Sequence, residues 1–108
     1  MSELTEKKCT PCEGGVPPLS GVLLEPYLKE VMGWEVVDGK KIRKVFTFPD
    51  FKGALAFVNK VGDIAESEGH HPDIQLSWGK TVIELTTHAI GGLSENDFIL
   101  AAKIDATN

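Results

Sequence analysis

Three histidines are the side chains of this sequence best suited to proton transfer. His70 and His71 are adjacent, and His88 follows them further along the chain. Histidine is the residue type that most readily gains and loses a proton near neutral pH, which makes it a common general acid or base. If the segment that carries His88 folds beside the helix expected before His70, the three imidazoles can meet in one cleft. The spacing therefore predicts a candidate acid–base site.

Metal binding and a purely structural role are the two alternatives for these histidines. Three imidazoles could hold a zinc ion with one open position, with Glu66 and Asp73 as supporting carboxylates. Adjacent residues point in different directions, however, so His70 and His71 do not clearly converge on one ion. The segment through Pro72 could equally be a polar turn in which the proline fixes the backbone, and His88 could simply close a strand. Spacing alone leaves all three interpretations open.

A helix before the histidines and a hairpin after them would have to position these side chains. Apolar residues recur at helical spacing over 51–68, and Gly69 is a typical helix stop. Alternating apolar and polar residues then predict a strand over 73–78, with Trp78 packed on one strand face. A turn and a partner strand over 81–88 complete the hairpin.

Two further helices are predicted, one near each end of the chain. The first begins at Ser20, a good N-cap, and ends at Gly33, while Pro26 should kink it or shift its start. The last has Ser94 as its N-cap and Asp97 at the capping-box position. Its expected hydrophobic staple is the pair Leu93 and Phe98.

A second hairpin is predicted between the first helix and the middle one. Strands over 34–37 and 42–48 flank Asp38-Gly39, a strong two-residue hairpin signal. The second strand has one face whose burial the pattern does not decide, formed by Ile42, Lys44, Phe46 and Phe48. The resulting order is helix, strand, strand, helix, strand, strand, helix. This order predicts an α+β fold, an antiparallel sheet with three helices on one face.

The composition is that of one ordinary globular domain. The chain has 108 residues, is 42% hydrophobic and carries a formal net charge of −5. A negative charge argues against binding nucleic acid or an anionic membrane surface. The one dense basic run is interpreted as a solvated strand face and consists of Lys40, Lys41, Arg43 and Lys44. A start rich in Pro and Gly predicts an irregular tail over 1–19 and leaves 20–108 as a single domain.

No apolar stretch of the sequence is long enough to span a bilayer, and the N-terminus lacks the apolar centre of a signal peptide. The expected compartment is therefore the cytoplasm. Cys9 and Cys12 form a C-x-x-C that lacks the strand-to-helix context of a thioredoxin-like motif. Two thiolates are half of a tetrahedral zinc site, which a pair of chains could complete.

The segment Glu66-Ser67-Glu68-Gly69-His70-His71-Pro72 resembles the signature of the pterin-4a-carbinolamine dehydratase family. In that family an acidic residue stands four positions before His-His-Pro, and an aromatic, a histidine and an aspartate follow at intervals. The matching residues here are Trp78, His88 and Asp97. The neighbourhood agrees through Thr86-Thr87-His88, Gly91-Gly92-Leu93-Ser94 and Gly33-Trp34. The resemblance extends from about Leu19 to the end of the chain.

This resemblance implies a fold, a substrate and an assembly. The family has a four-stranded antiparallel sheet with three helices on one side and forms dimers or tetramers. Its substrate is a 4a-hydroxytetrahydropterin, which loses water to give a quinonoid dihydropterin during recycling of the pterin, and biopterin is the familiar case. The reaction uses neither a metal nor another cofactor, because acid–base catalysis suffices.

The resemblance also implies a role for each residue that matches. His70 and His88 are the proton-transfer candidates, acting on opposite faces or different epimers of the substrate, and His71 binds and orients it. Glu66 stands one helical turn before His70, where it can polarise an imidazole. The expected substrate-binding set is completed by Gly69, Pro72, Thr86, Thr87 and Ala89.

Asp97 and Trp34 have two expected roles each. Asp97 is interpreted first as a helix cap and second as a residue that supports the site. Trp34 matches an aromatic residue near the family's site, and a core or interface position is an equal alternative for it.

Two departures and one alternative function accompany the resemblance. Asn96 stands where animal members often have arginine, and Pro26 interrupts the first helix unusually. Some members act by bridging or stabilising partner proteins, so a protein-interaction role without catalysis is the alternative to the dehydratase.

Overall fold

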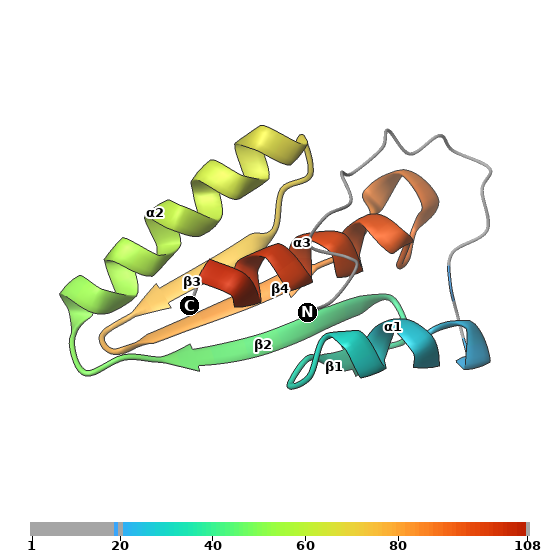
Figure 1. The fold of residues 1–108 in the computed structure, drawn as a ribbon, viewed down its shortest axis with the longest axis horizontal. Coiled ribbons are helices and arrows are strands. Elements are labelled where there is room, and N and C mark those ends of the chain that lie inside the picture. Colours follow the sequence, from blue (N-terminus) through green and yellow to red (C-terminus); the bar gives the residue numbers. More distant parts are fainter. Residues whose placement is uncertain (1–18, 20, 108) are drawn as a thin grey trace.

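The computed structural model describes Leu19 and residues 21–107. Within them the α+β fold with the order α-β-β-α-β-β-α is confirmed (Figure 1). The helices are α1 (Glu25–Glu30), α2 (Phe51–Glu68) and α3 (Glu95–Thr107), with short 3₁₀ turns η2 (Gly21–Leu23) and η3 (His88–Ile90). The strands are β1 (Glu35–Val37), β2 (Lys41–Thr47), β3 (Asp73–Ser77) and β4 (Lys80–Leu85). The tail predicted over 1–19 lies outside the described residues except for Leu19.

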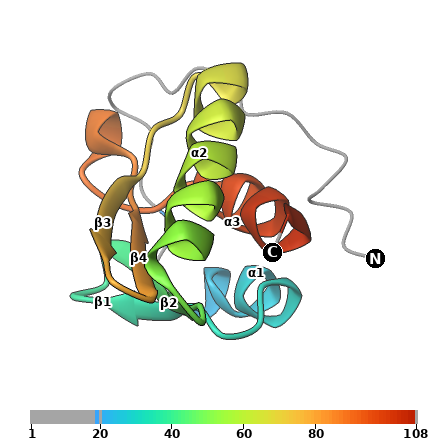
Figure 2. The ribbon, with the colours of Figure 1, turned by 90° about the vertical axis from the view of Figure 1, so that its left-hand side faces the viewer.

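The four strands form one antiparallel sheet in the order β1-β2-β4-β3. Viewed from the end, the three helices lie on the same side of this sheet (Figure 2). Because β2 and β4 are central, each is paired on both edges. The register between them runs from Ile42 opposite Leu85 to Thr47 opposite Lys80.

The core fills the space between the sheet and the helices. Ile42 and Phe46 are buried, so the face of β2 that the sequence left undecided is the inner one. Lys44 shares that face and is half-buried because it reaches the last turns of α3. Helix α1 packs on α3 through Tyr27 and Phe98, whose rings stack with centroids 5.1 Å apart. Leu93, the partner of Phe98 in the predicted staple, is fully buried in the same core.

The first helix begins later than the sequence indicates. It was expected from Ser20, but the chain first makes the turn η2, and α1 starts only at Glu25. Pro26 occupies its first turn, where a missing backbone donor costs nothing. The predicted shift in helix start is therefore confirmed, and Pro26 introduces no kink.

The second hairpin differs from its prediction at two points. Trp78 was expected to pack on a strand face, but β3 ends at Ser77 and the indole is 72% exposed in the turn. The prediction for Trp78 is therefore wrong. Strand β4 ends at Leu85 instead of His88, because Thr87 pairs with Gly92 across a tight loop and His88 enters η3.

Candidate functional site

The segments that carry the predicted site residues meet at one end of the sheet. Asp73 at the start of β3 lies opposite Glu84, and Leu85 at the end of β4 lies opposite Ile42 at the start of β2. Residues just before β3, just after β4 and just before β2 must therefore leave the sheet at the same end. His70 and His71 lie just before β3, His88 lies just after β4, and the β1–β2 turn lies just before β2.

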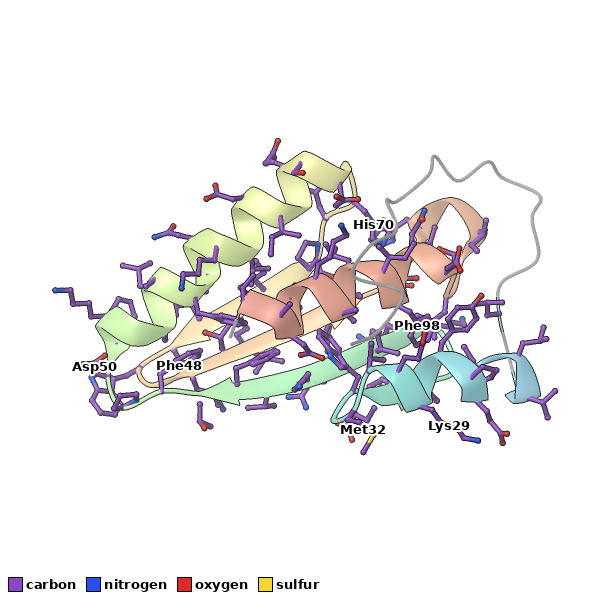
Figure 3. The ribbon with its side chains drawn as sticks, in the orientation of Figure 1. Lys29, Met32, Phe48, Asp50, His70 and Phe98 are labelled. Atoms are coloured by element: carbon purple, nitrogen blue, oxygen red, sulfur yellow. The ribbon has the colours of Figure 1, made fainter. Side chains whose placement is uncertain are left out.

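His70 is held by the end of α2. Gly69 adopts the left-handed conformation, with φ of 66°, and the backbone N–H of His70 donates to the carbonyl of Ala65 at 3.3 Å. This predicted stop turns the chain towards α3, and Figure 3 shows His70 between the end of α2 and that helix. Its Nε2 lies 2.6 Å from Oδ1 of Asp97. The imidazole is only 14% exposed, so this contact is well shielded from water.

Asp97 combines the two roles that the sequence left open for it. Its side chain is completely buried. Oδ2 accepts the backbone N–H of Ser94 at 3.0 Å, which is one half of a capping box, while Oδ1 faces His70. A carboxylate in the first turn of a helix is also favoured by the helix dipole. The carboxylate therefore caps α3 and orients an imidazole at once.

Thr87 points into the protein and supports Asp97. It is buried, and its hydroxyl donates to Oδ2 of Asp97 at 2.8 Å. The hydroxyl of Ser94 lies 2.8 Å from the same Thr87 oxygen. Because Thr87 uses its hydrogen on the carboxylate, Ser94 donates to Thr87. Thr87 was expected in the substrate-binding set. Its hydroxyl faces the carboxylate of Asp97, so it is placed to act on substrate through Asp97 and His70.

Glu66 contacts His71 and not His70. Its Oε1 lies 3.1 Å from Nε2 of His71, and the two side chains are 80% and 58% exposed. The helical spacing from Glu66 would bring it to His70 only if α2 continued. Since α2 stops at Glu68 and the left-handed Gly69 redirects the chain, the next imidazole takes the contact. The imidazole that Glu66 can orient is therefore that of His71.

His88 lies on a pocket of about 370 Å³ at the same end of the sheet. Its exposed imidazole has no hydrogen bond or ion pair within the described part of the chain. The pocket is lined by Val37, Asp38, Lys40, Lys41, Thr86, His88 and Gly91. Two predicted site residues, Thr86 and His88, are thus brought together, whereas His70 and His71 lie outside the lining.

The remaining predicted site residues separate into neighbours of the site and distant ones. Pro72 is half-buried between His71 and β3, three residues after Gly69. The side chain of Ala89 is not among those described. Trp34 is buried, and its Nε1 donates to Oδ2 of Asp105 at 3.0 Å. That contact makes Trp34 a core residue at the far end of α3, which is one of its two expected roles.

Asp38, Lys40 and the pair Glu68–Lys103 were missed by sequence reasoning. The first two line the pocket because the β1–β2 turn leaves the sheet beside the end of β4. Glu68 is nearly buried and lies 3.5 Å from Lys103, a second link between α2 and α3. The strand register could have identified the turn residues, but nothing in the pattern indicated the α2–α3 pair.

Within the described residues, no group of three or more histidine, cysteine, aspartate or glutamate side chains is placed to hold a metal ion. Cys9 and Cys12, the other metal candidates, lie outside those residues. None of the described helices is both long and apolar enough to cross a membrane.

Comparison with known proteins identifies the family. The family model for pterin 4 alpha carbinolamine dehydratase matches residues 17–107. The chain belongs to this family. A member from Rubrobacter xylanophilus, whose name assigns it to the pterin-4-alpha-carbinolamine dehydratases, is 54% identical over 97% of this chain and 98% of its own length. A second, from Methylococcus capsulatus and with the same assignment, is 52% identical over 94% of this chain and 90% of its own.

Two solved structures share the dehydratase fold. A transcriptional coactivator/pterin dehydratase from Brucella melitensis superposes with a TM-score of 0.78 at 31% identity, covering 82% of this chain and 96% of that one. A pterin dehydratase-like protein described as a RuBisCO assembly factor superposes with a TM-score of 0.61, over 71% of this chain and 90% of that one. At 24% identity this second likeness shows the fold alone.

Proposed function

We propose that this member of the dehydratase family is a hydro-lyase that converts a 4a-hydroxytetrahydropterin into a quinonoid dihydropterin, in pterin recycling such as that of tetrahydrobiopterin. The observation that carries the proposal is the shielded contact between His70 and the buried carboxylate of Asp97. His88 leaves the neighbouring strand at the same end of the sheet. Family membership supplies the substrate class, and this geometry supplies groups that can move protons.

The reaction moves two protons and changes no oxidation state. The C4a–O bond of the substrate breaks with its electron pair on oxygen, and a proton from the protein makes the leaving group water. The N5–H proton is lost to the protein, and its electron pair forms the C4a=N5 double bond. One group must therefore donate a proton while another accepts one, which is the task of general acid–base catalysis.

His70 is the proposed base and His88 the proposed acid. An ionised carboxylate can only accept, so the hydrogen of His70 sits on Nε2 and points to Asp97, leaving Nδ1 to receive a proton. The carboxylate then stabilises the imidazolium that forms. His88 is exposed beside the pocket and has no partner among the described residues, so it is available to protonate the departing hydroxyl. His71, bound by Glu66, orients the substrate.

Decay of 4a-hydroxytetrahydrobiopterin, followed by ultraviolet absorbance, tests this assignment. We expect the wild-type protein to accelerate the decay, and His70→Ala and His88→Ala each to reduce kcat by about 100-fold or more. Lys60 is exposed on α2, so Lys60→Ala is the matched control and should retain the full rate. Circular dichroism checks that each variant is folded. If both folded histidine variants keep the wild-type rate, the assignment is wrong.

A protein-interaction role is the second candidate function. The Brucella melitensis relative is described as a coactivator as well as a dehydratase. In this chain Phe51, Leu55 and Trp78 expose large apolar surfaces at the end of the molecule where α2 begins and β3 turns into β4 (Figure 1). A stoichiometric partner recovered with the purified chain, together with a decay rate equal to that in buffer, would favour this role over the dehydratase.

We further propose that the protein acts in the cytoplasm as a homodimer or homotetramer. Family resemblance supports the assembly, and the exposed apolar side chains near the start of α2 are consistent with a covered surface. Sedimentation equilibrium should give two or four times the mass of the chain. A monomer at micromolar concentration would contradict the proposal.

A further inference from the structure

The end of α2 is attached to α3 by two polar contacts. Nε2 of His70 lies 2.6 Å from Oδ1 of Asp97, and Oε2 of Glu68 lies 3.5 Å from Nζ of Lys103. On α3 the two attachment points, residues 97 and 103, are separated by about 9 Å along the helix axis. A single contact would let the last turn of α2 pivot about it, whereas two separated contacts fix the direction of that turn.

The ion pair of Glu68 and Lys103 is shielded from water, unlike that of Glu66 and His71. The side chain of Glu68 is only 6% exposed and that of Lys103 is 19% exposed. A carboxylate with so little access to water needs a positive partner, because the loss of its hydration is costly. In sequence, the last turn of α2 contains no basic residue, and the helix dipole disfavours a negative charge there. Lys103 therefore supplies from α3 the positive charge that this turn lacks.

A displacement of Glu68 would be transmitted to His70. The two residues are separated only by Gly69, whose left-handed conformation turns the chain towards α3. The backbone N–H of His70 also donates to the carbonyl of Ala65 in the last turn of α2. The imidazole must therefore move with this turn. Because a hydrogen bond weakens steeply as its angle and length depart from their best values, the contact of His70 with Asp97 depends on where the turn is held.

We propose that Glu68 and Lys103 are positioning residues, whose ion pair holds the imidazole of His70 against the carboxylate of Asp97. The proposal rests on the proposed function, because it concerns the base of that reaction. In the described part of the chain neither residue is among those that line the pocket beside His88, so the pair acts through His70. Misplacing a group that accepts a proton slows the chemical step, and the loss should therefore fall on kcat and not on KM.

Nitrogen NMR of the imidazoles tests the positioning without requiring turnover. The protein is labelled with ¹⁵N-histidine at mildly alkaline pH, and His70→Gln assigns the signals of His70. In wild type we expect one tautomer, with its proton on Nε2 and protected from exchange by Asp97. Lys103→Met keeps an apolar stem but removes the charge, and should give a mixture of tautomers and a rapidly exchanging proton. Lys103→Arg keeps the charge and should keep the wild-type signal.

The absorbance assay measures the kinetic effect of the same variants. We expect Lys103→Met to reduce kcat by about 10-fold with KM nearly unchanged, and Lys103→Arg to restore most of the rate. Glu68→Gln leaves no shielded carboxylate without a cation and serves as the second variant if Lys103→Met does not fold; its kcat should fall several-fold. Lys44→Met is the matched control, because it removes the ion pair with Asp105 near the other end of α3. It should lower stability but keep kcat and the His70 signal.

Three results would overturn the proposal. They are an unchanged His70 signal in the folded variants, a changed signal with full kcat, and a fall in kcat that Lys103→Arg does not restore. An equal change of the signal in Lys44→Met would show that general loosening of the fold moves the imidazole, and would likewise overturn it. A wild-type protein without dehydratase activity would refute the proposed function, whereas the NMR signals would still decide whether the ion pair holds His70 on Asp97.

Discussion

Helix α3 carries a carboxylate near each end, and the two have different surroundings. Asp97 in the first turn is fully buried and contacts His70, Thr87 and the backbone of Ser94. Asp105 near the last turn has a side chain 26% exposed. It accepts from the indole of Trp34 at 3.0 Å and from the ammonium group of Lys44 at 2.9 Å. Of these two aspartates on α3, only Asp97 therefore has an imidazole among its neighbours.

The partners decide what each carboxylate can do. An indole N–H and a lysine hold Asp105 in place but do not exchange protons readily near neutral pH, so that end is an anchor. Lys44 also offsets the unfavourable field of the helix C-terminus on a negative charge. At the other end the helix field favours Asp97, and an imidazole lies beside it. Four predictions test whether these two ends of α3 differ in function.

Removing the charge of Asp97 should have the largest effect. Asp97→Asn leaves His70 without the carboxylate that fixes its tautomer and stabilises its protonated form, so we expect kcat to fall by about 100-fold. Asp105→Asn, the same change at the anchoring end, should alter kcat by less than about twofold. The absorbance assay measures both. Equal losses in kcat would mean that the two ends do not differ in function.

Removing the hydroxyl of Thr87, which lies at the same end of α3, should have a smaller effect on kcat. Thr87→Val leaves one oxygen of Asp97 short of a donor, and we expect kcat to fall by about 10-fold with KM nearly unchanged. Thr87→Ser restores the donor and should restore most of the rate. If the serine variant is as slow as the valine one, the hydroxyl does not position the carboxylate.

Changing Trp34 should affect stability and leave catalysis intact. Trp34→Phe keeps the ring in the core but removes the donor to Asp105, at a cost of about 1.5–3 kcal/mol in the free energy of unfolding. Urea denaturation measures this loss. kcat should stay within about twofold of wild type, because the change lies at the anchoring end. A large fall in kcat with little loss of stability would reverse the assignment of the two ends.

Replacing Glu66 should give the smallest effect of the four. Its contact with His71 is exposed on both sides, and exposed ion pairs contribute little. We expect Glu66→Gln to change kcat/KM by less than about threefold. A loss comparable to that of Asp97→Asn would show that His71 needs its carboxylate for catalysis as much as His70 does.

The sequence predicted best what local patterns determine. The bounds of α2 and its stop at Gly69 follow from periodicity and a cap residue. A turn at Asp38-Gly39 was also predicted and has positive φ at both positions, 55° and 68°, but Val37 pairs with Lys41, so the loop has three residues instead of two. The capping role of Asp97 was also evident, because its partner Ser94 is three residues away.

What the sequence did not predict depends on contacts between distant segments. The contact of His70 with Asp97 joins two helices, and Lys44 lies inward only because Asp105 receives it. Alternation alone extended β4 to His88, whereas pairing of Thr87 with Gly92 turns the chain away earlier. Trp78 fitted the alternating pattern, but its strand had already ended.

The two tryptophans give this protein a pair of optical probes in contrasting surroundings. Trp34 is shielded in the core, and its indole N–H is bound to Asp105, whereas Trp78 is 72% exposed in a turn. Emission from Trp34 should lie at shorter wavelength and resist quenching by acrylamide, and emission from Trp78 should be quenched readily. Fluorescence of a Trp78→Phe variant would therefore report loosening of the last turns of α3, independently of events at the histidines.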